Sequence, residues 1–422
     1  MNKKFLTFAA VALVLAACSS EEPIAPPMVE NDAMGANPYR VSLTDALKNA
    51  DALLGELGEG ETTRSAERKV ESVEYYSRPG TRALGGDTLL YLVNYADDAG
   101  FALLSADSRL RPIYAISEEG SMSFSDTTYN KGLALFARGV EAEIESSLTI
   151  PNDTAIFNPP TIPEEDVHID TLRSIRDRVS PMLTYYQRYW DQDSPFNRYC
   201  FTSSGAEAKV GCTAVAAAQI MSYYNWPQQY LYHTFNWDEI NAGNIDMLAR
   251  FLRVLGNSEN LNIHYAPIDS SDGSYASISN FYRTFDNMGY TYHSTFQNFN
   301  EAEVCAFLKG IHSGGYSAGP ILVDGRYPNN DGHSWVIDGY LQYNLTILTG
   351  ESPIFTSDDI LYHCVWGWGA KNNGYYYWAK RQRFDSEIIE QDRYDDSTEA
   401  PWEFLYFYNI KYMAGFAPQS MQ

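Results

Sequence analysis

Apolar residues at the start of the first predicted folded segment recur with the period of an α-helix. In SLTDALKNADALLGEL, residues 42–57, they fall on one helical face, and Ser42 and Asp45 fit a capping box. Three short apolar runs follow, separated by turn residues: DTLLYLVNY (87–95), GFALLSAD (100–107) and RPIYAIS (111–117). This spacing predicts an antiparallel meander. With a second predicted helix near 133–144, the pattern indicates a small α+β domain that ends near residue 150.

A proline-rich stretch without a helical period, IPNDTAIFNPPTIPEED at 150–166, follows this domain. Such a composition is typical of an exposed connection between domains. Arg173, Arg176 and Arg178 come next, and an exposed stretch with arginines is where proteolytic nicking is expected. We therefore expect a domain at 39–150, a linker with the activation cleavage at 151–178, and a second domain at 179–422.

The second domain begins with a helical pattern and continues with strand patterns. Residues 214–224 are apolar around most of the helical circumference, which predicts a centrally buried helix with Cys212 in its first turn. Strands rich in glycine and aromatic residues are predicted in PILVDGRYP (320–328), HSWVIDGYLQYN (333–344) and YHCVWGWGAKNNGYYYWA (362–379). The acidic stretch at 385–403 is predicted to be a solvated loop.

The first twenty residues, MNKKFLTFAAVALVLAACSS, have the pattern of an export signal. Lys3 and Lys4 precede an apolar stretch too short to span a bilayer, and small residues precede Cys18. LAAC, at 15–18, resembles the bacterial lipobox, whose cysteine is lipidated, and the following SSEEP resembles a tag for outer-surface lipoproteins. An ordinary cleaved secretory peptide is the alternative.

These features predict a lipoprotein signal peptide at 1–17, lipidation at Cys18 and a polar tether at 18–38. No later stretch has 18 consecutive apolar residues, so we expect membrane contact only through the lipid anchor. The expected location is the outer membrane or cell surface, with release on maturation as a further expectation.

Composition narrows the classes of function. A chain of 422 residues with 45% apolar residues is long enough for two domains, each with its own core. A formal net charge of −24 repels phosphate backbones, which argues against nucleic-acid binding. The 32 tyrosines fit either large cores or an exposed binding surface for peptide or glycan, and composition does not separate the two.

Four cysteines follow the signal: Cys200, Cys212, Cys305 and Cys364. They form neither a dense disulfide framework nor a CxxC zinc pair, so no metal is expected and any disulfide pairing stays open. Cys212 differs because a thiol in the first turn of a helix feels the positive end of the helix dipole, which lowers its pKa. That position suits a nucleophile and equally suits a buried structural cysteine.

A cysteine nucleophile needs an imidazole that takes and returns a proton. Among seven histidines, His333 stands out because a loop with glycine delivers it onto a strand whose alternate residues Trp335 and Ile337 share its face. His363 is the rival, although its strand context equally suits a buried structural residue. We favour His333, since a histidine fixed on a rigid strand suits a general base.

Three motifs in fixed order carry a family resemblance. VGCTAVAAAQIMSYYNWP (210–227), GHSWVIDGY (332–340) and WGWGAKNNGYYY (366–377) resemble the streptopain family of papain-like cysteine peptidases. VSPMLTYYQRYWDQDSPFN (179–197) extends the match, and GFALLSADSRLRPIYAISEEGS (100–121) resembles the inhibitory propeptide of these enzymes. The resemblance covers nearly all of the chain after the tether. It implies an α+β fold: a papain-like domain with a helical part and an antiparallel β part, preceded by a small α+β inhibitory prodomain.

The resemblance also implies roles for individual residues. Cys212 matches the nucleophile and His333 its base and later acid. Gln192 matches the glutamine whose side-chain amide forms the oxyanion hole with the backbone N–H of the nucleophile. Trp366 matches a residue that covers the histidine, and Trp368 in the same loop fits plain packing at least as well.

The sequence departs from the family pattern at three positions. Most members have an asparagine directly before WGWG that orients the imidazole, and here this residue is Val365, which cannot accept a hydrogen bond. We expect a backbone carbonyl or a nearby polar side chain to hold the ring instead, or a less well fixed ring and a slower enzyme. Asp193 replaces a glycine after Gln192, which adds negative charge and would disfavour acidic substrates. Ala370 replaces the last glycine of WGWGG.

The sequence thus predicts an exported, lipid-anchored cysteine endopeptidase made as a zymogen. It would cleave protein or peptide substrates through a Cys–His dyad and a thioester acyl-enzyme, without a cofactor, and its own prodomain would inhibit it. Two alternatives are an inactive homologue that acts as a surface binding module and an acyl-transfer enzyme of transglutaminase or amidase type. An immunity or inhibitor protein is a more distant third.

Overall fold

The structure is a computed structural model that describes nine ranges of the chain: 40–57, 68–77, 88–125, 131–149, 172–270, 273–326, 332–349, 352–378 and 410–419. The predicted signal peptide, Cys18, the tether, linker residues 151–171 and the acidic stretch at 385–403 lie outside these ranges. Within them, no helix combines the length and apolar character that a membrane span requires.

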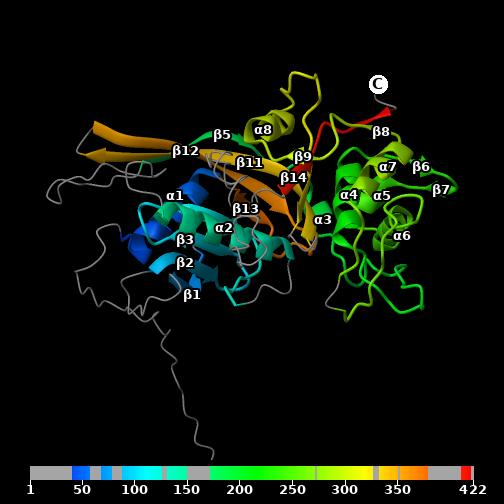
Figure 1. Cartoon of the computed structure of the whole chain (residues 1–422), viewed down its shortest axis with the longest axis horizontal. Helices are drawn as coiled ribbons and strands as arrows, with labels where there is room; N and C mark the ends of the chain where they lie inside the picture. The colour runs from blue at the N-terminus through cyan, green and yellow to red at the C-terminus, as the bar shows by residue number, and fades with distance from the viewer. Residues whose placement is uncertain are drawn as a thin grey trace, which may run out of the picture. The chain divides into compact units, whose positions relative to one another are not determined.

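An antiparallel sheet runs through most of the described chain (Figure 1). Its strands follow the order β1-β2-β3-β4-β13-β12-β11-β10-β14-β9, and β5 pairs with β11 beside this path. The bounds are β1 Val70–Ser77, β2 Thr88–Tyr95, β3 Phe101–Ser105, β4 Ile113–Ser117, β5 Leu172–Val179, β9 Gln297–Asn298, β10 Ile321–Arg326, β11 Gly332–Thr349, β12 Ser352–Val365, β13 Gly374–Tyr377 and β14 Ile410–Met413.

The N-terminal part contains the two predicted helices and the predicted meander. Helix α1 spans Leu43–Leu57, and α2 spans Lys131–Thr149. Ser42 Oγ accepts a hydrogen bond from Asp45 N at 3.1 Å, which is one of the two hydrogen bonds of the expected capping box. Strands β2, β3 and β4 are buried almost throughout, as the continuous apolar runs require.

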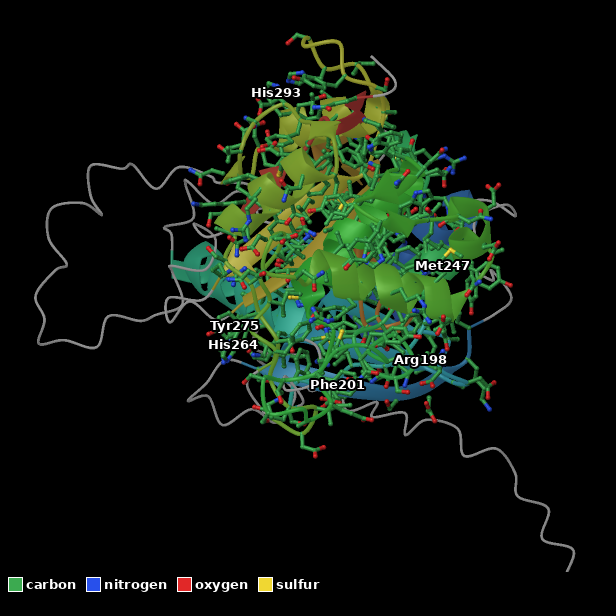
Figure 2. The ribbon with its side chains drawn as sticks, turned by 90° about the vertical axis from the view of Figure 1, so that its right-hand side faces the viewer. Arg198, Phe201, Met247, His264, Tyr275 and His293 are labelled. Carbon is green, nitrogen blue, oxygen red and sulfur yellow. The ribbon has the colours of Figure 1, made fainter. Side chains whose placement is uncertain are left out.

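The C-terminal part adds a helical layer next to the sheet. Its helices are α3 Tyr185–Arg188, α4 Cys212–Tyr223, α5 Trp237–Asn241, α6 Ile245–Leu255, α7 Ser279–Asn287 and α8 Glu301–Lys309. Two small two-stranded pairs complete it: β6 Gln229–Tyr230 with β7 His233–Thr234, and β8 Tyr290–Thr291 with β15 Ala417–Pro418. Figure 2 looks onto this layer and shows His264 and Tyr275, which form an isolated antiparallel bridge, lying close together.

Two apolar cores pack on opposite faces of β11, because successive strand residues point to opposite sides. Trp335 and Ile337 belong to the core that the N-terminal helices cover. Val336 belongs to the core of the helical layer, where the buried helix α4 lies. The expected α+β class, with a helical part, an antiparallel β part and a preceding α+β part, is therefore confirmed.

The N- and C-terminal parts share this sheet through the pairing of β4 with β13. A charged residue in an ion pair stands at each end of β4. Arg111, before β4, contacts Asp359 of β12, and Glu118, after it, lies 3.0 Å from Arg188 of α3. This boundary between the two parts, which we call the seam, is thus held by main-chain hydrogen bonds and by two ion pairs. In one pair the N-terminal part supplies the cation, and in the other it supplies the anion.

The segment with the arginines differs from the exposed, flexible stretch that we predicted. Residues 172–179 form β5, which pairs with β11 from Thr346 to Tyr340. The exposed main chain of the long strand β11 offers hydrogen bonds that composition alone does not reveal. Arg176 and Arg178 are nonetheless solvent-exposed on this strand.

Candidate active site

Cys212 is the first residue of α4, and its position depends on the glycine before it. Gly211 has φ of 93°, a left-handed backbone that glycine tolerates, and a methyl group there would lie 3.1 Å from the carbonyl oxygen of Ser274. The next ten residues of α4 are all buried. Cys212 itself is half-buried at the start of this fixed helix, where first-turn N–H groups have no acceptor within the helix.

His333 lies near the start of β11, opposite Gly325 of β10, and is 2% exposed. Its Nε2 is 2.7 Å from the carbonyl oxygen of Trp366. Because a carbonyl only accepts, Nε2 carries the hydrogen, which leaves Nδ1 of the neutral ring as the nitrogen that can accept a proton. The ring is therefore fixed in the tautomer that can take a proton from the thiol.

The surroundings of Cys212 favour its thiolate. Burial raises the pKa of the thiol, but the charge and hydrogen bond of His333 lower it. The backbone N–H of Ser334 and the charge of Arg326 act in the same direction, and the net result is a lowered pKa. In contrast, burial raises the pKa of Cys200, Cys305 and Cys364, and the four cysteines that the structure describes are free thiols.

Three tryptophans surround the imidazole. The ring centroids of Trp335, Trp366 and Trp368 lie 6.3, 6.2 and 6.5 Å from that of His333. Trp366 is fully buried and Trp368 is 7% exposed. Both tryptophans of the WGWG motif thus lie beside the histidine ring, whereas we expected this mainly of the first.

Gln192 also lies in this site and is 4% exposed. Its side-chain Nε2 donates to the carbonyl oxygen of Gly367 at 3.3 Å, and its backbone carbonyl accepts from the backbone N–H of Val210, two residues before Cys212. Cys212, His333, Gln192 and Trp366, predicted from separate parts of the sequence, are thus brought together around the loop that follows β12.

Val365 lies in an apolar environment. It is fully buried, pairs with Val336 and belongs to the core of the helical layer. The hydrogen bond from His333 goes instead to the next residue's carbonyl, an amide oxygen like that of an asparagine side chain. We expected either another group to hold the ring in place of the missing asparagine or a less well fixed ring. The structure shows the first, because a backbone carbonyl accepts the hydrogen bond.

The charge of Asp193 is offset within the site. Lys209 Nζ lies 3.1 Å from the Asp193 carboxylate and 5.0 Å from the centroid of the Trp368 ring. Because the pair is only partly buried, it reduces the negative potential without a large desolvation penalty. The expected bias against acidic substrates is weakened accordingly.

The rival histidine, His363, is fully buried in a different setting. Its Nδ1 is 2.5 Å from Asp338 Oδ1, and its Nε2 is 3.5 Å from Glu118 Oε1, an ionic contact that is too long for a good hydrogen bond. Burial lowers the pKa of His363, but the charge and hydrogen bond of Asp338, followed by Glu118, raise it to about 9. Both ring nitrogens face carboxylates, so His363 is suited to hold charge rather than to exchange protons near neutral pH.

Helix α2 of the N-terminal part packs directly on the site. A methyl group at Gly132 would lie 2.6 Å from His333 Cδ2 and even closer to Trp366 Cε3. Further along the helix, the ring of Phe136 lies 4.9 Å from that of Tyr376 and 5.9 Å from that of Trp378. Only a residue without a side chain lets the start of α2 come this close to the imidazole.

Sequence reasoning missed Gly132 and Asn373, and it expected a backbone carbonyl or a polar side chain to hold His333 without identifying Trp366. Glycine near the start of a helix is too common to mark a contact, and a main-chain acceptor leaves no trace in the sequence. Asn373, in KNNGYYY, carried one weak signal: an amide side chain beside a run of buried aromatic residues needs internal partners.

Comparison with known proteins gives two family matches. Residues 190–376 match the model of the peptidase C10 family, and residues 39–144 match that of the Spi protease inhibitor. A curated relative, "Thiol protease/hemagglutinin PrtT" of Porphyromonas gingivalis, is 24% identical over 330 residues, which are 69% of this chain and 34% of the relative. The chain thus spans about a third of the length of that relative.

Two solved structures from Prevotella intermedia also resemble the chain. A fragment of prointerpain A has a TM-score of 0.47 and 15% identity, and covers 82% of this chain and 98% of that chain. Active interpain A cysteine protease has a TM-score of 0.34 and 19% identity, and covers 48% of this chain and 87% of that chain.

Proposed function

Because residues 190–376 belong to the peptidase C10 family and residues 39–144 to the Spi protease inhibitor family, we propose that the chain is a cysteine endopeptidase zymogen. Its substrates are proteins or peptides. The observation that carries the proposal is the position of Cys212, at the start of a buried helix where His333 lowers the pKa of its thiol, together with the Trp366 carbonyl that holds Nε2 of His333.

The reaction begins with a proton transfer from the Cys212 thiol to Nδ1 of His333. The thiolate attacks the peptide carbonyl, and the C–N bond breaks as the imidazolium protonates the leaving amine. A water molecule, deprotonated by His333, then attacks the thioester and releases the acid and the thiol. Throughout this cycle the Nε2–H group donates to the Trp366 carbonyl, which stabilises the imidazolium that forms in each half-reaction.

The developing oxyanion is stabilised by the Cys212 backbone N–H and by Nε2 of Gln192. Gln192 Nε2 has two hydrogens, and one of them is used by the Gly367 carbonyl. The second is the donor that the proposal assigns to the oxyanion. Removal of one such donor costs on the order of 100-fold or more in kcat.

The N-terminal part acts as the intramolecular inhibitor. Helix α2 contacts His333 and Trp366 through Gly132, and β4 adds a strand to β13 of the peptidase part. A substrate cannot reach the imidazole from this side while α2 is in place. Cleavage within residues 151–171, before β5, would disconnect the inhibitor while leaving the pairing of β5 with β11 intact.

Export and lipidation at Cys18 complete the proposal, and they rest on the sequence pattern of residues 1–18. The anchor precedes the inhibitor segment in the chain. Cleavage in the linker therefore separates the peptidase from its anchor, so that activation and release from the membrane are one event.

The test compares the full-length wild type with Cys212→Ala and His333→Ala. We expect wild type to hydrolyse an unfolded protein substrate, to lose its N-terminal segment and to react with a thiol-directed peptide inhibitor at Cys212, as located by mass spectrometry. Both variants should do none of these. Equal hydrolysis by wild type and Cys212→Ala would refute the proposal, and transfer of the acyl group to added amines in preference to water would favour the transferase alternative.

A further inference from the structure

Two successive carbonyl groups hold the two polar side chains of the proposed active site. The carbonyl of Trp366 accepts from His333 at 2.7 Å, and that of Gly367 accepts from Gln192 at 3.3 Å. Both belong to the segment 366–373 between β12 and β13, which we call the tryptophan loop. The path of this loop therefore sets the position of the base and of the oxyanion donor together.

The loop holds this path with a backbone that few residues can adopt. Gly367 has φ of 71° and Gly369 has φ of 66°. A methyl group at Gly367 would lie 3.0 Å from Val215 of α4, so the loop also lies close against the helix that carries Cys212. Such a loop needs specific hydrogen bonds to hold it, because glycines leave the unfolded chain many alternatives.

Asn373 supplies these hydrogen bonds from a position that is 2% exposed. Its Oδ1 accepts from Trp366 N at 3.0 Å, and its Nδ2 donates to the carbonyl of Gly369 at 3.2 Å. The second hydrogen of Nδ2 goes to the carbonyl of Arg188 at 3.1 Å. One side chain thus joins both ends of the WGWG motif to the segment that leads into Gln192.

We propose that Asn373 is a positioning residue for the reaction: it fixes the tryptophan loop so that the Trp366 and Gly367 carbonyls hold His333 and Gln192 in register with Cys212. This inference rests on the proposed peptidase function. Asn373 touches neither the substrate nor the reacting atoms. Through Trp366 it helps to orient the imidazole, a role that the apolar side chain of Val365 cannot perform.

A buried asparagine of purely structural importance would produce a different result. Its loss would lower stability without changing how the imidazole and the thiol share a proton. Asn260 offers a matched control, since it is fully buried and its Nδ2 donates to the Val254 carbonyl at 2.9 Å, within the helical layer. Asn260→Ala should lower stability but leave the active site unchanged.

The experiment uses the full-length chain with Asn373→Ala, Asn373→Asp and Asn260→Ala. The first readout is the pH dependence of Cys212 alkylation by iodoacetamide, followed by mass spectrometry, and the second is kcat and KM after processing. We expect Asn373→Ala to move the alkylation midpoint to higher pH and to lower kcat by about 100-fold with little change in KM, since a shift of about 1 Å in a catalytic group has effects of this size. Asn373→Asp retains the acceptor for Trp366 N and loses both donors, so it should be intermediate, while Asn260→Ala should match wild type in both readouts.

Two kinds of failure are distinguishable. A wild type that alkylates like an ordinary thiol and hydrolyses nothing overturns the proposed function itself. A wild type that is active, together with folded Asn373 variants that keep its alkylation profile and kcat, overturns only the positioning role. If Asn373→Ala does not fold, Asn373→Asp decides the question by the same two readouts.

Discussion

The contact between Gly132 and the imidazole gives a test of how the N-terminal part keeps the enzyme latent. Gly132→Ala adds one methyl group, which would lie 2.6 Å from His333 Cδ2, closer still to Trp366 Cε3 and 2.7 Å from Trp366 Cζ3. Carbon atoms pack without strain at 3.5–4.0 Å, so the helix and the rings must separate by roughly 1 Å. His333 is held by the Trp366 carbonyl, and Trp366 Nε1 donates to Asn372 O at 2.9 Å, so we expect α2 to move.

Two opposing effects decide the magnitude. Alanine favours a helix over glycine by about 1 kcal/mol, which alone would strengthen the inhibitor. Overpacking of a well-filled contact costs about 1–3 kcal/mol, and three contacts below 3.0 Å place this one near the upper end. The net weakening of inhibitor docking is about 1–2 kcal/mol. This increases the fraction of molecules in which the inhibitor is undocked roughly 5- to 30-fold.

The assay is the rate at which a thiol-directed peptide inhibitor labels Cys212 in full-length protein before processing. Gly55→Ala is the matched control, because the same substitution in α1 meets no atom within 4 Å. Gly132→Ala should label 5- to 30-fold faster than wild type, and Gly55→Ala should not label faster. Labelling of Gly132→Ala at or below the wild-type rate would show that the close contact does not restrain the enzyme.

Three further predictions concern buried groups of the seam and the site. Glu118→Gln leaves the Arg188 charge without its carboxylate and should weaken inhibitor docking by about 3 kcal/mol, seen as faster self-processing; an unchanged rate would argue against the ion pair. The pKa of His363 is raised to about 9 in the fold from 6.5, so its contribution to stability is complete below about pH 6.5 and disappears as pH rises through about 9. Thermal unfolding of Cys212→Ala should therefore show a loss of up to about 1.4 kcal/mol per pH unit in this interval, and a flat profile would contradict the buried charge. Val365→Ala should lower the free energy of unfolding by about 1–2 kcal/mol yet leave the pH profile of Cys212 alkylation unchanged, because a carbonyl and not residue 365 holds the imidazole; a shifted profile would count against this.

The sequence predicted the elements whose cause is local. The apolar periods gave α1, α2, α4 and the meander β2–β4, because each buries a face or a full circumference that the chain itself displays. The place of Cys212 in the first turn of a helix was predicted from the apolar residues that follow it. The place of His333 on a strand was predicted from the apolar alternation after a glycine. The family resemblance then added Gln192 and Trp366, which no period or spacing marks.

The features that escaped prediction depend on partners distant in the chain. Residues 172–179 were expected to be flexible, but β11 provides a main chain for them to pair with. Glu118 and His363 are separated by more than 200 residues, and no local pattern indicates that they share a buried cluster. The acceptor for His333 is a backbone carbonyl, so the sequence could show only that Val365 is not that acceptor.

The most direct test of the account follows inhibitor release and activity in the same sample. Full-length wild type should begin to hydrolyse a peptide substrate only as the segment up to residue 149 is cut away, with the rate proportional to the processed fraction. Cys212→Ala, cut by added wild-type enzyme, should show the same new N-terminus and no hydrolysis of its own. Full activity before any cleavage, or activity of the cut Cys212→Ala chain, would contradict a latent peptidase with Cys212 as its nucleophile.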